Sequence, residues 1–330
     1  MKFGIFGGVN ELPGGGESEA GSYRRYIDTV IEAERLGYHS SFLVEHHFSG
    51  TGQVSASLSL LAHLAARTTR IRLGTAVVVL PWHNPVLVAE EVATVDLLSG
   101  GRFDFGVGKG YRYNEFHGFC MAVEEAGERF EEAMAVIRKA WTTEGRFSHH
   151  GKRWHFEDIV IEPGVTQQPH PPLWLAAGRP DSLRYAAAEG YNLMLDQFQT
   201  VEVILERLDV YRQALAEVGR AYDPTGVAVA RGVAVVGNEA EREAAIAQRM
   251  RMIEMMNAYG RSPDGRAKSS MVSDDDLRKA AEQGALIGTP GAIIDRLEGM
   301  RARGVGYVLL STRNREALRA FAAEVMPAFA

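Results

Sequence analysis

Hydrophobic and polar residues along the chain fall into two alternating patterns: short apolar runs and longer amphipathic stretches. The short runs predict strands at Lys2–Gly7, Ser41–Val44, Ile71–Val79, Arg102–Val107, Leu173–Ala176, Tyr191–Leu195, Val227–Val236 and Tyr307–Leu310. The longer stretches predict helices at Ser22–Leu36, Ser55–Ala66, Pro85 to about Ser99, Ala126–Trp141, Asp181–Glu189, Val201–Val218, Glu239–Met256, Pro290–Arg303 and Arg315–Val325. A helix is therefore expected after almost every strand.

This regular order predicts parallel strands joined by right-handed crossovers. Strands such as TAVVVL and YVLLS are apolar at consecutive positions, as is typical of parallel strands that are buried on both faces. We therefore expect an α/β fold of the (β/α)8 TIM-barrel class, forming a single domain over residues 1–330. The alternative is an open doubly wound sheet, but no GxGxxG motif follows the first strand, which weakens its dinucleotide-binding form.

Two segments interrupt the alternation and are interpreted as insertions after the fourth and seventh helices of the barrel. The first, residues 142–172, contains RWHFEDIVIEP, whose alternation suggests a small hairpin. The second, residues 257–288, begins with polar and glycine-bearing sequence. We expect it to form a mobile loop and a short helix at about Asp274–Gln283, acting together as a lid over the active site.

Composition excludes several classes of function. The chain has 36 basic and 42 acidic residues and a net charge of −6, so a general nucleic-acid role is unsupported. Its single cysteine, Cys120, excludes an intrachain disulfide and a four-cysteine zinc site, and it fits a reducing, cytoplasmic location. No run approaches the roughly 18 apolar residues of a membrane span. The first residues do not read as a signal peptide either.

The end of the second strand carries Glu45, His46 and His47, and a barrel places its active site at the carboxyl ends of its strands. Neighbouring strand residues point to opposite sides, so the two histidines are not expected to bind one metal ion together, and no metal is predicted. One histidine can face the pocket while the other packs or orients a neighbour. Two purely structural histidines are the alternative. Glu45 either orients a histidine or pairs at the strand end.

A second candidate site follows the fifth strand, where AAGRPDS leads directly into a helix. A glycine-bearing turn before a helix offers free backbone N–H groups and the positive end of the helix dipole, which together suit a phosphate group. The alternative is an ordinary helix cap without a ligand. The fourth strand ends in VGKG, where the glycines permit a tight turn beside Lys109.

Several blocks of the sequence resemble the bacterial luciferase-like family of flavin-dependent monooxygenases. They are the MKFGIF start, AERLGYHSSFLVEHHF (Ala33–Phe48), GTAVVVLPWHNPVLVAEEVATVDLLSGGRFDFGVGKG (Gly74–Gly110), and GTP and VMP near the end. The resemblance implies a barrel that binds FMN non-covalently. It also implies that a separate flavin reductase supplies reduced FMN, which reacts with O2 to a flavin hydroperoxide that oxygenates a small organic substrate. A homodimer is a further implication.

Carried over by position, the resemblance assigns roles to individual residues. His46 matches the family's catalytic histidine, and His47 lies beside it. A non-proline cis peptide beneath the flavin ring would fall at Ala76–Val77. The residues implied to contact the FMN phosphate are Lys109, Arg129, Gly178, Arg179 and Ser182. The chain departs from luciferase at Gly108, which replaces a reactive cysteine and argues against aldehyde-dependent luminescence, and at Arg179, which replaces a small polar residue.

Other functions on the same fold stay open at this point. Some relatives use a deazaflavin coenzyme for hydride transfer, and a catalytically silent flavin-binding protein is a further alternative. A metal-dependent barrel hydrolase ranks last. The helix at Ser55–Ala66 is apolar enough either to form a dimer interface or to pack wholly within one chain. The sequence does not identify the substrate.

Overall fold

The structure is a computed structural model that describes residues 1–9, 18–50, 54–260, 272–273, 276–312 and 314–330. The first half of the predicted lid, including residues 261–271, therefore lies outside the described residues. No helix in the described ranges is long and apolar enough to cross a membrane.

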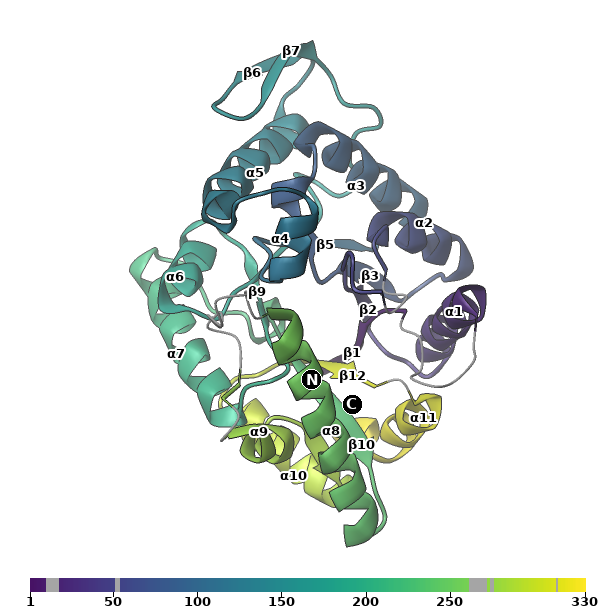
Figure 1. Cartoon of the computed structure of the whole chain (residues 1–330). Coiled ribbons are helices and arrows are strands. Elements are labelled where there is room, and N and C mark those ends of the chain that lie inside the picture. The colour runs from purple at the N-terminus through teal and green to yellow at the C-terminus, as the bar shows by residue number, and fades with distance from the viewer. Residues whose placement is uncertain (10–17, 51–53, 261–271, 274–275, 313) are drawn as a thin grey trace. The chain divides into compact units, whose positions relative to one another are not determined.

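The strands follow one another in the order of a closed barrel (Figure 1). Along the sheet the order is β10-β12-β1-β2-β3-β5-β8-β9, and β9 pairs again with β10. The predicted (β/α)8 barrel is thereby confirmed. The barrel strands are β1 (Lys2–Gly7), β2 (Ser40–Leu43), β3 (Arg72–Thr75), β4 (Val78–Val79), β5 (Phe103–Gly108), β8 (Leu173–Ala176), β9 (Asn192–Leu195), β10 (Val227–Val235) and β12 (Tyr307–Ser311).

Helices follow the strands largely where the sequence predicts them. They are α1 (Glu19–Arg35), α2 (Ser57–Arg67), α3 (Pro85–Ser99), α5 (Ala126–Thr142), α6 (Pro180–Ala188), α7 (Val201–Glu217), α8 (Glu239–Gly260), α10 (Pro290–Ala302) and α11 (Arg315–Glu324). Local chemistry sets several of their ends. The Asn84 side chain accepts hydrogen bonds from two backbone N–H groups at the start of α3, and Gly100 ends that helix in the left-handed conformation.

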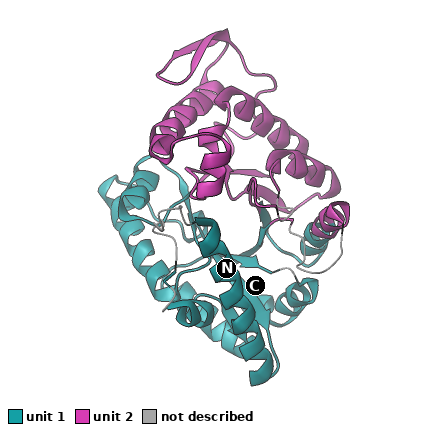
Figure 2. Ribbon diagram, viewed as in Figure 1, with its two compact units in different colours: residues 1–7, 28–42, 175–330 teal, residues 8–27, 43–174 magenta. Residues whose placement is uncertain are grey.

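Contacts divide the chain into two compact units (Figure 2). Unit 1 comprises Met1–Gly7, Asp28–Phe42 and Leu175–Ala330, and unit 2 comprises Gly8–Ile27 and Leu43–Trp174. Within unit 1, β12 pairs in parallel with both β1 and β10. Strands β10 and β12 are buried along most of their length, and β1 is buried at its centre.

Within unit 2, β5 is buried throughout and pairs with β3 and β4. The buried Asp104 on β5 accepts hydrogen bonds from Arg72 at 2.6 Å and from the indole N–H of Trp174 at 3.1 Å. Each unit thus has an apolar interior, and in unit 2 the buried Asp104 is paired with a cation.

Four details depart from the predicted elements. The third strand is interrupted at Ala76–Val77, whose peptide bond is cis, as the resemblance implied. A short helix, α4 (Tyr113–Gly118), lies in a stretch where none was predicted. Helix α8 continues four residues beyond the predicted Met256, and a short strand, β11 (Leu286–Gly288), pairs with the end of β10.

The first insertion forms the predicted hairpin, made of β6 (Phe147–His150) and β7 (His155–Ile159). The hairpin is held to α5 by Glu132, whose carboxylate accepts hydrogen bonds from the backbone N–H groups of Arg153 and Trp154. In the second insertion, α9 (Leu277–Gln283) confirms the expected short helix.

Candidate active site

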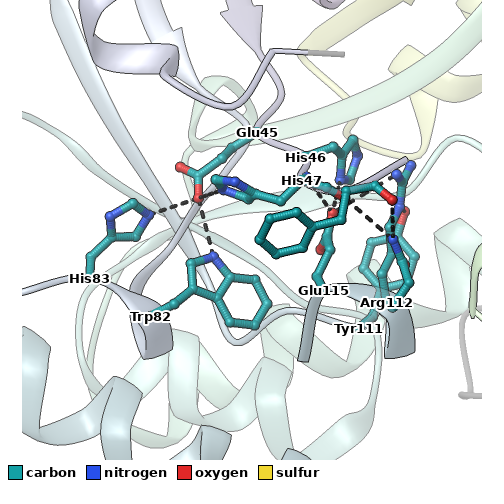
Figure 3. Close-up of polar contacts among 10 residues, drawn as sticks. Glu45, His46, His47, Trp82, His83, Tyr111, Arg112 and Glu115 are labelled. Atoms are coloured by element: carbon teal, nitrogen blue, oxygen red, sulfur yellow. Dashed lines mark hydrogen bonds and ion pairs between the residues drawn. The ribbon is translucent and has the colours of Figure 1, made fainter. Parts of the chain in front are cut away.

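The two adjacent histidines after β2 diverge to different partners, both within unit 2 (Figure 3). His46 lies against Glu115 of α4, whereas His47 lies against Glu45. The segment itself is anchored by the backbone, since the N–H of His46 donates to the carbonyl of Val54 at 2.8 Å. The structure therefore agrees with the expectation that the two side chains do not converge on one point.

His46 is buried beside a buried carboxylate. Its Nδ1 lies 3.0 Å from Oε1 of Glu115, and the two side chains are 14% and 2% exposed. Burial lowers the His46 pKa, and although Glu115 acts in the opposite direction, the net pKa lies below the usual value of a histidine. The lowered pKa favours the neutral form of the His46 imidazole, which can accept a proton.

His47 belongs to a different cluster, centred on Glu45. One carboxylate oxygen of Glu45 lies 3.1 Å from Nε2 of His47, 2.8 Å from Nε2 of His83 and 3.4 Å from the indole nitrogen of Trp82. Burial alone would raise the Glu45 pKa, but the hydrogen bonds from His47 and His83 outweigh it and lower this pKa to about 2. Glu45 thus contacts two histidines, which favours the prediction that it orients a histidine.

The atoms of this second cluster are of the types that bind metal ions. One carboxylate oxygen of Glu45 and one ring nitrogen each of His47 and His83 all lie within 4.8 Å of one another. Two histidines and a carboxylate can hold a divalent transition metal. The hydrogen bonds of His47 and His83 to Glu45 are sufficient to account for the closeness of these three atoms.

The predicted phosphate turn lies in unit 1, at the start of α6. Arg179 precedes the helix in an extended conformation, Pro180 is its first residue, and no side chain in the described ranges caps this end. A Cβ atom at Gly178 would lie 3.0 Å from the Arg207 guanidinium, so the turn is closely approached by this side chain. The turn therefore combines uncapped backbone N–H groups, a half-buried Ser182 and a nearby positive charge, which fits a phosphate group.

Lys109 and Arg129, the other predicted phosphate contacts, lie in unit 2. Lys109 Nζ is 3.2 Å from Glu131, and Arg129 Nε is 2.9 Å from Glu125. Both pairs are partly exposed, and such pairs contribute only about 0–1 kcal/mol. Either cation can therefore exchange its carboxylate for an anionic ligand.

The Ala76–Val77 cis peptide packs against Gly108, the position at which this chain differs from luciferase. A side chain at Gly108 would come within 2.6 Å of Cγ2 of Val77. Real side chains do not approach so closely, so Gly108 is required by the Ala76–Val77 segment as this chain folds.

Sequence reasoning missed Glu115, Trp82, His83 and Arg112, which the structure places around the two histidines. His83 directly precedes Asn84, and the Asn84-Pro85 pair indicates only that a helix begins there. Glu115 lies 69 residues from His46 along the chain and in a helix without a clear amphipathic pattern. No local signal in the sequence links either residue to the end of β2.

Comparison with known proteins decides the family. A family model described as luciferase-like monooxygenase matches residues 1–306. The chain belongs to the luciferase-like monooxygenase family. It is 25% identical to the oxygenase component of the flavin-dependent trigonelline monooxygenase of Acinetobacter baylyi, over 100% of this chain and 96% of that protein. It is 27% identical to the FMNH2-dependent dimethylsulfone monooxygenase of Pseudomonas putida, over 92% of this chain and 87% of the relative.

Two solved structures share the fold of this chain. The monooxygenase RslO1 of Streptomyces bottropensis superimposes with a TM-score of 0.84 at 26% identity, over 100% of both chains. An F420-dependent secondary alcohol dehydrogenase superimposes with a TM-score of 0.79 at 16% identity, over 100% of this chain and 99% of that one. The second likeness concerns the fold alone.

Proposed function

We propose that this protein is the oxygenase component of a two-component FMN-dependent monooxygenase. It uses reduced FMN from a separate flavin reductase, together with O2, to oxygenate a small organic substrate. The similarity to relatives named as an oxygenase component and as FMNH2-dependent supports this function. The observation that carries it is the largely enclosed His46 imidazole, whose Nδ1 lies 3.0 Å from the buried carboxylate of Glu115 after β2.

FMN is the cofactor in this proposal, and residues of the described chain fit its phosphate and its ring. The uncapped start of α6, with Gly178, Arg179 and Ser182, suits the phosphate. The cis peptide at Ala76–Val77 is the segment that would support the flavin ring, as the resemblance to the family implies. When bound, reduced FMN supplies the electrons that activate O2.

His46 is the proposed catalytic residue. A neutral imidazole can take up a proton and return it during oxygen transfer, a task that a histidine already protonated at neutral pH performs poorly. His47 is held by Glu45 and packs edge-on against the ring of Phe119 at 5.0 Å between centroids. We assign His47 to the support of the site and not to the proton transfer itself.

A homodimer in the cytoplasm completes the proposal. The apolar side chains of α2, including Leu60, Leu61 and Leu64, are buried within the chain, which favours the intrachain alternative for that helix. On α3, in contrast, Leu87, Leu97 and Leu98 are each more than half exposed, and exposed leucines on one helix favour an interface with a second copy. Sedimentation at micromolar concentration tests the dimer.

The function is tested by turnover in 18O2 with a flavin reductase, NADH and FMN, over a panel of compounds that begins with trigonelline and dimethylsulfone. We expect at least one compound to gain one 18O atom while the remaining compounds yield only hydrogen peroxide. Oxidation of reduced FMN to peroxide with every compound, at the rate of free reduced FMN, would favour a silent flavin-binding protein.

Hydride transfer with a deazaflavin coenzyme is the second candidate, favoured by the fold shared with the F420-dependent alcohol dehydrogenase. The two functions differ in the cofactor that binds and in the fate of oxygen. Reduction of F420 by an alcohol, with no 18O in any product, would support the second candidate and overturn the first.

A further inference from the structure

The carboxylate of Glu115 connects α4 to both histidines after β2 (Figure 3). Its Oε1 lies 3.0 Å from Nδ1 of His46 and also accepts a hydrogen bond of 3.0 Å from the backbone N–H of His47. The side chain is 2% exposed, so water does not compete for this oxygen. Such a buried acceptor can fix the orientation of the ring that it contacts.

We propose that Glu115 is a positioning residue that holds His46 as the Nδ1–H tautomer and thereby leaves the lone pair of Nε2 for proton transfer. Oε1 of Glu115 already accepts the backbone N–H of His47 and so acts as an acceptor, which places the proton between Glu115 and His46 on Nδ1. The neutral imidazole then has no proton on Nε2. This inference rests on the proposed role of His46.

The Nε2 atom is available for such a role. No hydrogen-bond partner for it occurs in the parts of the chain that the structure describes, and the ring of Tyr111 stands edge-on at 6.3 Å between centroids. The contrast with His47 is informative, because Nε2 of His47 is turned towards Glu45. Of the two adjacent histidines, His46 alone has its Nε2 uncommitted.

Glu115 is itself fixed in place by several contacts of α4. Arg112 Nη1 lies 3.9 Å from its Oε1, and Arg112 is buried. The Asn114 side chain donates to the backbone carbonyls of His47 and Phe48, which ties α4 to the histidine segment. Phe119, directly after α4, packs against Phe48 with ring centroids 4.8 Å apart. The carboxylate therefore has little freedom to leave His46.

Burial and the charged groups around His46 act on its pKa in opposite directions, and the net effect lowers it. Burial lowers the His46 pKa, the contact with Glu115 raises it, Arg112 lowers it, and the more distant Glu45 raises it. Removal of the Glu115 charge therefore lowers the His46 pKa further. It also removes the preference for one tautomer, because a glutamine amide can present either its oxygen or its NH2 group to Nδ1.

The test is nitrogen NMR of the whole protein labelled with 15N-histidine, with the His46 signals assigned from their loss in His46→Gln. We expect wild-type His46 to show a protonated Nδ1 and an unprotonated Nε2 between pH 7 and 8. In Glu115→Gln we expect a mixture of tautomers and a lower His46 pKa. Glu124→Gln is the matched control, since Glu124 is exposed and lies on no part of the site, and its spectrum should equal that of the wild type.

Turnover of the substrate found with 18O2 supplies a second readout. Glu115→Gln should lower kcat about 10- to 100-fold while the affinity for reduced FMN changes less than about twofold, and Glu115→Asp should recover part of the loss. A wild-type His46 protonated on Nε2 would overturn the inference without any variant. A tautomer unchanged in folded Glu115→Gln would also overturn it.

The experiments distinguish failure of this inference from failure of the proposed function. If His46→Ala retained full oxygenation while the tautomer followed Glu115, the positioning contact would stand and the catalytic role of His46 would fall. If no compound is oxygenated at all, the NMR arm still decides whether Glu115 sets the tautomer of His46.

Discussion

His46 and His47 are neighbours in the sequence, yet their surroundings differ in origin and in electrostatics. His46 is paired with Glu115, 69 residues away, and burial leaves its pKa below the usual value. His47 shares the oxygen of Glu45, two residues away, with His83, whose pKa is raised because the hydrogen bond to Glu45 outweighs its burial. The difference separates a histidine suited to proton transfer from a cluster suited to holding the site together.

The largest effect is expected for His46. His46→Ala should lower substrate oxygenation at least about 100-fold, the usual scale for a positioned acid or base. Binding of reduced FMN and the fold should persist, and the reducing equivalents should appear as hydrogen peroxide. Product and peroxide are measured together in the reductase-coupled assay. Equal losses in His46→Ala and His47→Ala would erase the proposed division between the two histidines.

The next prediction tests whether Glu45 stabilises the fold through His47 and His83. Glu45→Leu leaves the donors of His47 and His83 without their buried acceptor, so we expect a loss of about 1–3 kcal/mol in the free energy of unfolding. Urea unfolding followed by circular dichroism measures this loss. Glu124→Leu, which removes an exposed carboxylate from the same unit, is the control and should change the stability by less than about 0.5 kcal/mol. A fully stable Glu45→Leu protein would contradict a structural role for the cluster.

Ser182 lies in the other unit and should affect neither histidine. Ser182→Ala should weaken the binding of reduced FMN by roughly 1–2 kcal/mol, because a hydrogen bond to a charged group is lost. Fluorescence titration under anaerobic conditions measures the affinity, with Asp181→Asn as the neighbouring control. Unchanged affinity in both Ser182→Ala and Lys109→Ala would place the phosphate elsewhere.

The smallest expected effect is a change in the free energy of unfolding with pH. The pKa of His83 is raised in the folded protein, so its pairing with Glu45 stabilises the fold fully below the unfolded value of about 6.5 and less as pH rises through the folded pKa. The stability difference between wild type and His83→Gln should therefore shrink between pH 6 and pH 9. Glu45 adds no dependence in this window, because its pKa is lowered to about 2. A constant difference would show that His83 does not titrate with Glu45.

The sequence could predict the fold because the barrel depends on local patterns. Apolar runs, the Asn84 cap and the glycines after helices are each visible over a few residues, and they mark almost every strand and helix of the barrel. The histidines and the phosphate turn were also visible, since they stand at strand ends and were supported by resemblance to a family.

The partners of the histidines could not be predicted in the same way. Glu115 is brought to His46 only when the barrel closes and α4 folds back, and no spacing in the sequence encodes a contact across 69 residues. Glu45 was noticed because it is adjacent to the histidines, but the role of its charge depends on burial and on His83. The sequence thus indicates which side chains can react, and tertiary contacts decide which of them does.

The central claim is that reduced FMN is the cofactor of this protein. It is tested most directly by anaerobic titration with reduced FMN, oxidised FMN and reduced F420, followed by admission of O2. We predict one reduced FMN bound per chain, more tightly than oxidised FMN or reduced F420, and release of peroxide more slowly than from free reduced FMN. Tighter binding of reduced F420, or no binding of FMN in either state, would contradict the account.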